Sequence, residues 1–432
     1  MYKKFVLWRL QKYVKKYFKK HAPKLVVVTG SVGKTGTKYA ISTVLGEKLR
    51  VRMQDGNHNS EFSVPLAILG IKYPKNPHSI LEWFRVFLSA RVRIKRDNEV
   101  DVIVQELGMD HPGDIVKFGQ YLRPDIAVVT AVSPEHMENM KDIETVAKEE
   151  LSVSAFSGLT IINYDDIDVR FASLLQSKNV TSYGLSEKAE YRLVANAVSP
   201  LENKVGVLLT PEWGRTPITS QLVGYHNFKS VVAAAAVAAK LGLSAAETAA
   251  GITKITSLPG RMQILRGANG SVILDDTYNS SPLAMLAALQ TLYDIPASRR
   301  IAIIGGMNEL GDYSREGHEI VGQKCDSKYL EWVITIGQEA AQYIAPIAEQ
   351  KGCRVRAFRT PYQAGGFVHA LLEKDTVVLV KGSQNNIYAE ESIKPILSNA
   401  EDEKLLVRQT RDWMKRKNEN LDYSEPDNVV VT

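Results

Sequence analysis

The chain has 432 residues, 44% hydrophobic and 24% charged, which is enough for two or three domains with ordinary globular cores. Its two cysteines, Cys325 and Cys353, belong to no Cys-x-x-Cys or Cys/His cluster, which argues against a disulfide framework or a zinc site and favours a reducing cytoplasm. The net charge is +6, no apolar run reaches the roughly 18 residues of a membrane span, and no signal-peptide pattern opens the chain.

Residues 1–22 are basic, contain no acidic residue, and are predicted to form an amphipathic helix that ends before Pro23. Val6, Leu10, Tyr13 and Tyr17 recur at helical spacing. Three interpretations stay open: packing on the first domain with a solvated basic face, peripheral contact of residues 2–20 with anionic lipid, or binding of nucleic acid. No recognition motif elsewhere supports the third, so no nucleic-acid partner is predicted. The sequence indicates no particular oligomeric state.

From residue 23 onwards, short apolar runs alternate with helical patterns, which predicts an α/β fold with a mainly parallel sheet. We expect a central P-loop ATPase-type domain over 23–257, a C-terminal Rossmann-like α/β domain over 258–412 and a polar tail over 413–432 that is disordered at its end. Predicted parallel strands cover 25–29, 100–105, 126–130, 159–163, 271–275, 300–304, 332–336 and 377–380. Helices are predicted over 34–48, 80–92 and 227–241, and antiparallel strands within 185–222.

The most informative stretch follows the first predicted strand and contains Gly30, Ser31, Val32, Gly33, Lys34 and Thr35. A strand, a glycine turn and a helix start in this order form a phosphate-binding loop. The glycines let backbone N–H groups face phosphate oxygens, Lys34 supplies a cation for the β- and γ-phosphates, and the Thr35 hydroxyl can bind Mg²⁺. Val28 stands where the longer loop has a glycine, so this is the short TGxxGKT form.

Three further positions of the central domain can carry chemistry. Glu106 ends a predicted strand at the sheet edge where ligands bind, and it could complete a Mg²⁺ site with Thr35 or be a solvated carboxylate. His136 follows the next strand and is either a metal or phosphate ligand or a structural histidine. Lys148 lies on an acidic helix, where spacing alone indicates a surface ion pair.

Polar residues also follow the strands of the second unit. Arg261 comes after a Pro-Gly turn that could be an interdomain hinge, and it could reach a phosphate across a cleft. Asp276 and Asn279 belong to a polar burst at a strand end, and Lys381 and Ser383 follow another strand in the same way. These positions predict one cleft between two domains. Asn227 opens a predicted helix, so it could be a ligand contact or simply the N-cap of that helix. The pair Gly305-Gly306 follows a predicted strand but lacks the third glycine of a dinucleotide-binding site, so NAD binding is not predicted.

Together these motifs resemble the Mur ligase superfamily of ATP-dependent amide ligases, and within it the MurF-like branch. Ten matches run in family order from about residue 23 to 395. They comprise Thr29 to Thr35, Gly56 to Glu61, Gln105 to Gly108, His136 to Glu138, Ala147 to Glu150, Gly224 to Asn227, Pro259 to Arg261, Asp275 to Pro282, Gly305 to Gly311, and Lys381 to Ser383.

The resemblance implies that ATP phosphorylates a substrate carboxylate and that an amine attacks the acyl phosphate, releasing ADP and phosphate. For the metal and phosphate side, the resemblance implies that Lys34 and Thr35 hold phosphates and Mg²⁺, that Glu106 and His136 are metal ligands, and that a carbamylated Lys148 helps to hold a second Mg²⁺. For the nucleotide, it implies that Asn227 and Asn279 contact adenine, that Asp276 contacts ribose and that Arg261 contacts the γ-phosphate. For the substrate, it implies that Lys381 and Ser383 face the acyl phosphate and that Asn57 and Asn59 approach the substrate. The implied catalytic set is Lys34, His136, Lys148 and Arg261.

Some positions depart from the family pattern. Only about 22 residues precede the ATP domain, where these enzymes carry an N-terminal domain that grips a UDP-sugar. Gly306, Gln384 and Ser63 replace an Asp, an Arg and a Gly of the family motifs. The main hypothesis is addition of D-Ala-D-Ala to a muramoyl-peptide cell-wall precursor in the cytoplasm, with a possible peripheral membrane contact. The alternatives are a Mur-like ligase for another carboxylate, such as a polyglutamate or pseudomurein-type peptide, or a non-catalytic ATP-binding scaffold.

Overall fold

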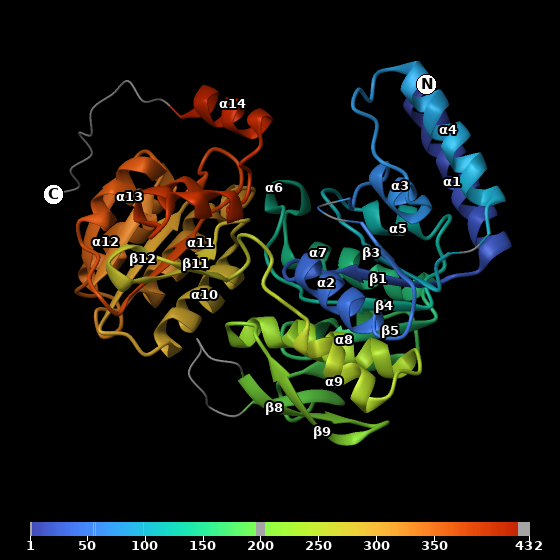
Figure 1. The fold of residues 1–432 in the computed structure, drawn as a ribbon, viewed down its shortest axis with the longest axis horizontal. Helices are drawn as coiled ribbons and strands as arrows, with labels where there is room; N and C mark the ends of the chain where they lie inside the picture. Colours follow the sequence, from blue (N-terminus) through green and yellow to red (C-terminus); the bar gives the residue numbers. More distant parts are fainter. Residues whose placement is uncertain (1, 55, 57, 98, 196–203, 422–432) are drawn as a thin grey trace.

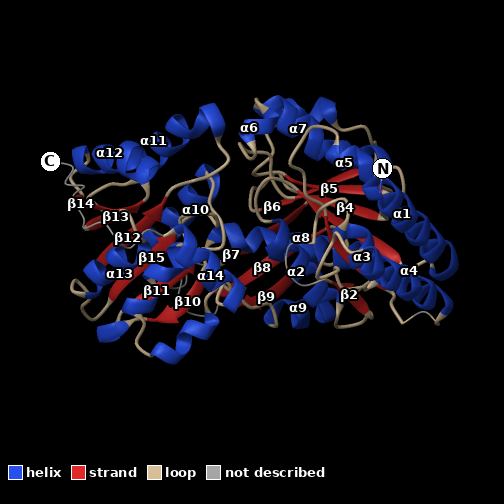
Figure 2. Cartoon of the chain, turned by 90° about the horizontal axis from the view of Figure 1, so that it is seen from above, coloured by secondary structure: helices blue, strands red, loops and turns tan. Residues whose placement is uncertain are grey.

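The computed structural model describes residues 2–54, 56, 58–97, 99–195 and 204–421, and these form two α/β units. Figure 1 shows the unit built from the C-terminal part of the chain, from yellow through orange to red, beside the larger unit that contains the N-terminus. Figure 2 shows their strands as two separate groups flanked by helices. The predicted two-domain α/β architecture is therefore confirmed, while the boundaries at 22/23, 257/258 and 412/413 stay predictions.

Within the described residues, nine strands form the first sheet, in the order β2-β3-β1-β4-β5-β6-β7-β8-β9. All neighbours from β2 to β7 pair in parallel, whereas β8 is antiparallel to both β7 and β9. The antiparallel strands expected within 185–222 are thus present. The strand bounds are β1 Lys24–Thr29, β2 Val51–Met53, β3 Val102–Glu106, β4 Ile126–Val129, β5 Leu159–Asn163, β6 Val180–Gly184, β7 Tyr191–Ala195, β8 Lys204–Thr210 and β9 Gly214–Ser220.

Helices cover both faces of this sheet because β1 presents apolar side chains to each. Val26 and Val28 pack with Ile41 of α2 and with α8, whereas Leu25 and Val27 pack with α1, α3, α5 and α7. The helix bounds are α1 Tyr2–His21, α2 Lys34–Leu45, α3 Ser63–Leu69, α4 Ile80–Lys95, α5 Asp114–Phe118, α6 Met137–Met140, α7 Ile143–Leu151, α8 Tyr225–Lys240 and α9 Ala245–Thr253.

The second sheet has the order β10-β11-β15-β12-β13-β14 in the described part of the chain, and only β10 is antiparallel to its neighbour. Leu274 and Ile304 face α10 to α12, and Ile273 and Ile303 face α13. The bounds are β10 Gln263–Arg266, β11 Val272–Asp276, α10 Pro282–Asp294, β12 Arg299–Gly305, α11 Ser314–Lys324, β13 Trp332–Ile336, α12 Ala345–Gln350, β14 Arg354–Phe358, α13 Pro361–His369, β15 Thr376–Lys381 and α14 Arg411–Asn420.

The amphipathic N-terminal helix is present as α1, and it lies beside α4. Val6, Leu10, Tyr13 and Tyr17 are buried, as their spacing predicts. The ammonium of Lys20 donates to the carbonyl of Lys95, so the C-terminal ends of the two helices meet and the helices run in the same direction. No helix in the described ranges is both long and apolar enough to cross a membrane.

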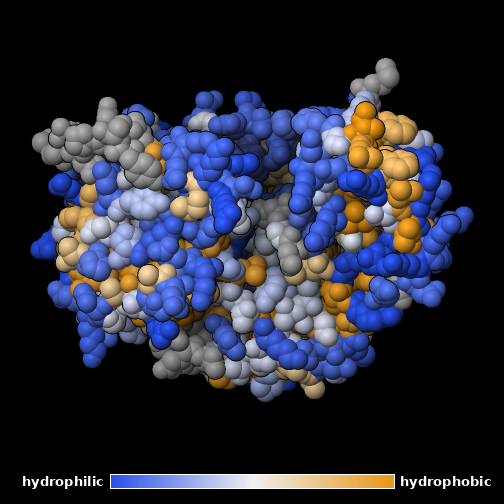
Figure 3. Space-filling view, turned by 45° about the horizontal axis from the view of Figure 1, so that its top comes forward, coloured by the Kyte–Doolittle hydropathy of each residue, from blue (hydrophilic) through white to orange (hydrophobic). Residues whose placement is uncertain are grey.

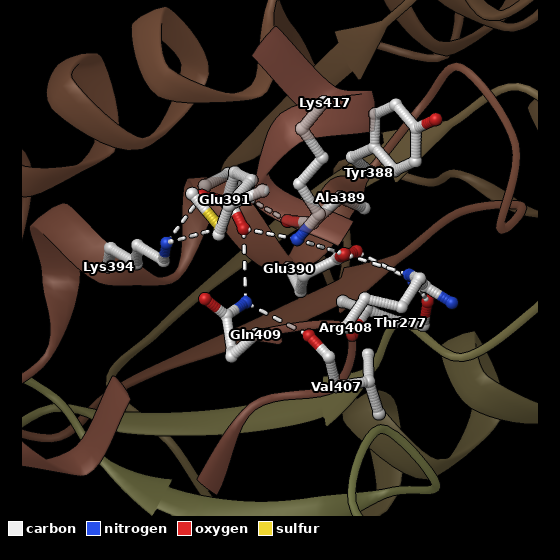
Figure 4. A network of polar contacts seen from close by, with 12 residues as sticks. Thr277, Tyr388, Ala389, Glu390, Glu391, Lys394, Val407, Arg408, Gln409 and Lys417 are labelled. Carbon is white, nitrogen blue, oxygen red and sulfur yellow. Dashed lines mark hydrogen bonds and ion pairs between the residues drawn. The ribbon is translucent and has the colours of Figure 1, made fainter. Parts of the chain in front are cut away.

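The first part of the predicted polar tail is helical and is attached to the second unit. Helix α14 crosses the predicted boundary, and Lys417 is completely buried between two glutamates (Figure 4). Its ammonium lies 2.7 Å from Glu390 and 2.5 Å from Glu391. Burial of a charge is tolerated here because each partner is oppositely charged. The expected disorder of the chain end falls on residues 422–432, which lie outside the described residues.

Candidate active site

The predicted phosphate loop links the end of β1 to the start of α2. Gly30 has φ 124° and Gly33 has φ 88°, backbone conformations that favour glycine. A Cβ on Gly30 would lie 2.8 Å from the backbone nitrogens of Thr130 and Ala131, so the loop also needs glycine for space. The Ser31 N–H donates to the Ala131 carbonyl and holds the loop against the end of β4. The result is a rigid turn that opens at a helix N-terminus, where an anion binds well.

The Lys34 ammonium is surrounded by carboxylates. It donates to the Gly30 carbonyl at 2.5 Å and lies 3.3 Å from both carboxylate oxygens of Glu135. Burial alone would lower the pKa of Lys34, but the attraction of Glu135, Glu150 and Glu106 outweighs it and raises the pKa. Lys34 therefore stays a fixed cation at the phosphate loop.

Thr35 and Glu106 meet as the sequence predicts. The Thr35 hydroxyl donates to Glu106 Oε2 at 3.0 Å, and the Asn59 amide donates to Oε1 at 3.2 Å. This arises because β3 pairs with β1, which puts Glu106 opposite Val28 at the entrance to the loop. A buried carboxylate beside a hydroxyl is an oxygen pair of the kind that Mg²⁺ uses together with phosphate oxygens and water.

His136 connects the two units. It has φ 50°, and its Nδ1 lies 2.8 Å from a carboxylate oxygen of Glu309 in the second unit. Its Nε2 lies 3.7 Å from Glu135. Burial lowers the pKa of His136, but the hydrogen bond to Glu309 and the charge of Glu135 outweigh this and raise it. His136 is therefore an interdomain contact in this structure. Among the described residues there is no group of three or more His, Cys, Asp or Glu arranged to hold a metal.

Lys148 is not brought into the site. It is exposed on α7 and is absent from the residues that line the cleft, so the structure places it apart from the other site residues. Glu150, two residues further on, is fully buried and accepts a hydrogen bond from Thr29 next to the phosphate loop. Burial raises the pKa of Glu150 to about 7. Successive residues of an α-helix are rotated by about 100°, so the side chains of residues two positions apart point to nearly opposite faces of the helix.

Arg261 approaches the phosphate loop from the second unit. One guanidinium nitrogen lies 3.5 Å from the Thr35 hydroxyl, and the guanidinium carbon lies 4.1 Å from the centre of the Tyr278 ring. Arg261 Nε is buried without a hydrogen-bond partner among the described residues. An arginine stacked on an aromatic ring and left with a free donor is suited to an anionic ligand.

Asp276 and Lys381 form a buried pair at the ends of neighbouring strands. The Lys381 ammonium donates to Asp276 Oδ2 at 2.7 Å and to the Asn279 carbonyl at 2.9 Å. The register of β11 and β15 places Asp276 opposite Lys381. Ser383 is also buried, and its hydroxyl accepts the N–H of Asn308 at 2.9 Å, so it braces the loop after β12 instead of lining the cleft.

Asn227 does not cap α8. The helix begins at Tyr225, because Gly224 with φ 88° makes the turn before it, and the Asn227 side chain donates to the Val223 carbonyl at 2.7 Å. Asn227 therefore lies in the first turn and lines the cleft beside His226. Burial lowers the pKa of His226 to about 4, which keeps that ring neutral at ordinary pH.

One cleft of about 740 Å³ is lined by both units, as expected for a ligand site between two domains. Most of the predicted site residues line it, and Gly30, Lys148 and Ser383 do not. Asn57 lies outside the described residues. The residues in the cleft are Ser31, Val32, Gly33, Lys34, Thr35, Asn59, Glu106, His136, Asn227, Arg261, Asp276, Asn279 and Lys381.

Sequence reasoning did not assign roles to Glu135, Glu150 and Glu309, although they surround the predicted residues. Each lay inside or next to a quoted motif: Glu135 precedes His136, and Glu150 follows Lys148 by two positions. An acidic residue next to a predicted cation or imidazole was the available signal. The sequence does not show which of several neighbouring carboxylates points toward the phosphate loop, because that depends on the orientation of each side chain on its helix or loop.

Comparisons with known proteins agree with this architecture. Residues 28–238 match the Mur ligase middle domain, and residues 260–384 match the Mur ligase, glutamate ligase domain. The chain is 27% identical over 339 residues to the UDP-N-acetylmuramoyl-tripeptide–D-alanyl-D-alanine ligase of Bacillus subtilis, covering 78% of this chain and 67% of the relative. The enzyme of the same name from Escherichia coli is 26% identical over 321 residues, covering 73% and 65%.

The fold is also similar to that of a solved structure, the MurF ligase from Thermotoga maritima in complex with ADP. The TM-score is 0.75 at 22% identity, and the match covers 92% of this chain and 84% of the other. This chain spans about two thirds of the length of the curated relatives that it matches.

Proposed function

Because the chain belongs to the Mur ligase family, we propose that it is an ATP-dependent, ADP-forming ligase. It activates a carboxylate as an acyl phosphate and joins it to an amine. The observation that carries this proposal is the approach of Arg261 to Thr35 at 3.5 Å. Thr35 directly follows Lys34, so one cation from each unit lies at the same phosphate site. Phosphoryl transfer depends mainly on such positioning and charge stabilisation.

We propose the following division of roles. Lys34 and the loop N–H groups hold the β- and γ-phosphates, and Arg261 binds the γ-phosphate from the opposite side. Asn227 and Asn279 contact adenine, and Asp276 contacts ribose. Lys381 and Ser383 support the acyl-phosphate side, and Asn57 and Asn59 support the substrate side. The free Nε of Arg261 and the cleft position of most of these residues support this assignment.

Mg²⁺ fits the oxygen pair of Thr35 and Glu106, where it would neutralise phosphate charge during transfer. The proposal of a second Mg²⁺ held by His136 and a carbamylated Lys148 rests on the family resemblance alone. The exposed position of Lys148 gives it no support, whereas Glu150 already places a carboxylate beside the loop. We therefore favour Glu150 over Lys148 as the residue of α7 that acts beside the phosphate loop.

The proposed reaction is addition of D-alanyl-D-alanine to a muramoyl-peptide precursor in the cytoplasm, which the names of both curated relatives support. A second candidate is ligation of a different carboxylate. It is favoured by Gln384, which lines the cleft where the family motif has an arginine and so brings one positive charge fewer to an acidic substrate. Residues 2–20 are proposed to make a peripheral membrane contact in either case.

Mass spectrometry of products tests the proposal. The full chain is incubated with ATP, Mg²⁺, D-Ala-D-Ala and a muramoyl tripeptide, with and without the UDP group, and Arg261→Met serves as the control. We expect a product heavier by one dipeptide less water, together with ADP, and loss of both with Arg261→Met. ADP formed only with another acid would support the second candidate. Nucleotide binding without any amide product would contradict the ligase proposal itself.

A further inference from the structure

The structure leaves one large apolar surface uncovered, and it lies on α1 and α4. Nineteen large hydrophobic side chains are exposed among the described residues, and eight of them belong to these two helices. Figure 3 shows hydrophobic atoms in orange gathered at the upper right, where α1 and α4 lie in Figure 1, with hydrophilic atoms in blue around them. The eight are Tyr2, Phe5, Trp8, Ile80, Leu81, Phe84, Leu88 and Val92. We call this set the α1–α4 surface.

The spacing of these residues shows that α4 has two apolar faces, and that α1 adds exposed hydrophobic residues near its N-terminus. On α4, Ile80, Phe84, Leu88 and Val92 recur every four residues and form one outer stripe. The inner side of the same helix is separate, since Trp83 and Val86 are buried against α1. A helix that needed only to pack on its own domain would keep its outer stripe polar. Packing within the domain therefore does not explain the outer stripe, which is exposed.

Charge indicates which medium covers it. The two helices carry twelve lysines and arginines against a single acidic residue, Glu82. That excess is larger than the net charge of +6 of the whole chain, so the remainder of the chain is net negative. On α1 the Lys12 ammonium lies 3.8 Å from the centre of the exposed Trp8 ring. Aromatic rings beside long basic side chains are typical of the membrane interface.

We propose that the α1–α4 surface docks on an anionic lipid bilayer, with the apolar stripe inserted among the headgroups and the basic side chains bound to lipid phosphates. The inference is independent of the ligase reaction and adds α4 to the contact proposed for residues 2–20. A nucleic acid would satisfy the charges but leave the apolar stripe in water. A second copy of the chain would cover the stripe but would bring two strongly basic surfaces together.

Vesicle flotation of the full chain tests this inference. One set of vesicles contains phosphatidylcholine alone and the other contains phosphatidylglycerol as well. We expect binding only to the anionic vesicles, with weakening as salt rises. Phe84→Ser and Leu88→Ser remove the stripe, and Lys15→Glu with Lys19→Glu changes the charge. Each basic residue at an anionic surface contributes about a fivefold change in binding, so the double charge variant should lose at least about 25-fold.

Matched controls separate this effect from general loss of structure. Val169 is the most exposed large hydrophobic residue of the described chain at 80%, and Val169→Ser and Lys178→Glu should bind vesicles like the unaltered protein. All substituted side chains are exposed, so thermal midpoints should stay unchanged. Equal binding to both vesicle types, or unchanged binding by the Phe84 and lysine variants, would overturn the proposal. Phe84-dependent dimers without vesicle binding would also overturn it and assign the surface to a second copy.

Discussion

Replacement of Lys417 by methionine tests how the C-terminal helix is attached. Figure 4 shows Lys417 reaching down from α14 to Glu390 and Glu391, which also bind Arg408 and Lys394. The Arg408 guanidinium donates in turn to the Thr277 and Tyr278 carbonyls, next to the polar loop of the cleft. Lys417→Met keeps the length and the apolar stem of the side chain but removes the charge.

The expected loss follows from the bonds removed. Lys417 makes two close ion pairs in a fully buried position, and hydrogen bonds to charged groups contribute about 1.5–3 kcal/mol each. Each glutamate keeps one other cation, so the cost should lie near the low end of the summed range, at about 3 kcal/mol. For a domain of this size, this corresponds to a fall in the unfolding midpoint of roughly 6–12 °C.

Calorimetry measures the midpoint, and hydrogen-exchange mass spectrometry locates the change, because a chain with two domains does not unfold in one two-state step. Faster exchange is expected in peptides from α14 and β15 and not in those from β1. Lys415→Met is the control on the same helix: Lys415 is 79% exposed and 3.9 Å from Glu419, so its loss should cost at most about 0.5 kcal/mol. Equal effects of the two variants would refute the reasoning.

Three other results are expected. Glu150→Gln should reduce ADP release roughly 10–100-fold, whereas Lys148→Ala should leave it nearly unchanged. If Lys148→Ala instead loses activity and formate or acetate restores it, the result would favour a carbamylated Lys148. Gly30→Ala should abolish binding of a fluorescent ATP analogue, because its Cβ would meet the backbone of Thr130 and Ala131 just after β4. Gly366→Ala should bind normally, because its Cβ would have no atom within 4 Å apart from its own helix and chain neighbours. Acid should destabilise the C-terminal domain through Glu391, whose pKa is lowered to about 2 despite its burial, because Lys394, Lys417 and Tyr362 bond to the carboxylate. Because the folded pKa lies below the usual 4.5, this stability is complete above pH 4.5 and is lost as pH falls toward 2. It amounts to about 3 kcal/mol, and thermal midpoints of Glu391→Gln should lack that part of the pH dependence.

The parallel strands could be predicted because burial on both faces leaves a local signal. All eight predicted parallel strands are present, and those at 159–163 and 332–336 have the predicted bounds. The strands that were not predicted lack such a run. β2 has only three residues, and β14 alternates arginine with apolar residues at the edge of its sheet. Their pairing is decided by the neighbouring strand, which a local pattern cannot reveal.

The phosphate loop and Glu106 could be predicted because each depends on a strand end, and strand ends were located well. Lys148 and α14 were not, because both depend on which side of a helix meets the rest of the fold. On α7, a difference of two positions separates an exposed lysine from a buried glutamate. On α14, the sequence is strongly polar, and only the pair Glu390 and Glu391 explains why Lys417 is inside.

Two contacts between the units are made by residues that line the cleft, so the position of the domains is linked to the charge of the ligand. His136 bonds to Glu309, and Arg261 approaches Thr35. Contacts of this polar kind between domains are readily broken and remade. A polyphosphate between Lys34 and Arg261 would attract a cation from each unit and so favour the arrangement in which they face each other. Closure and phosphate binding should therefore stabilise each other, because the same arginine takes part in both.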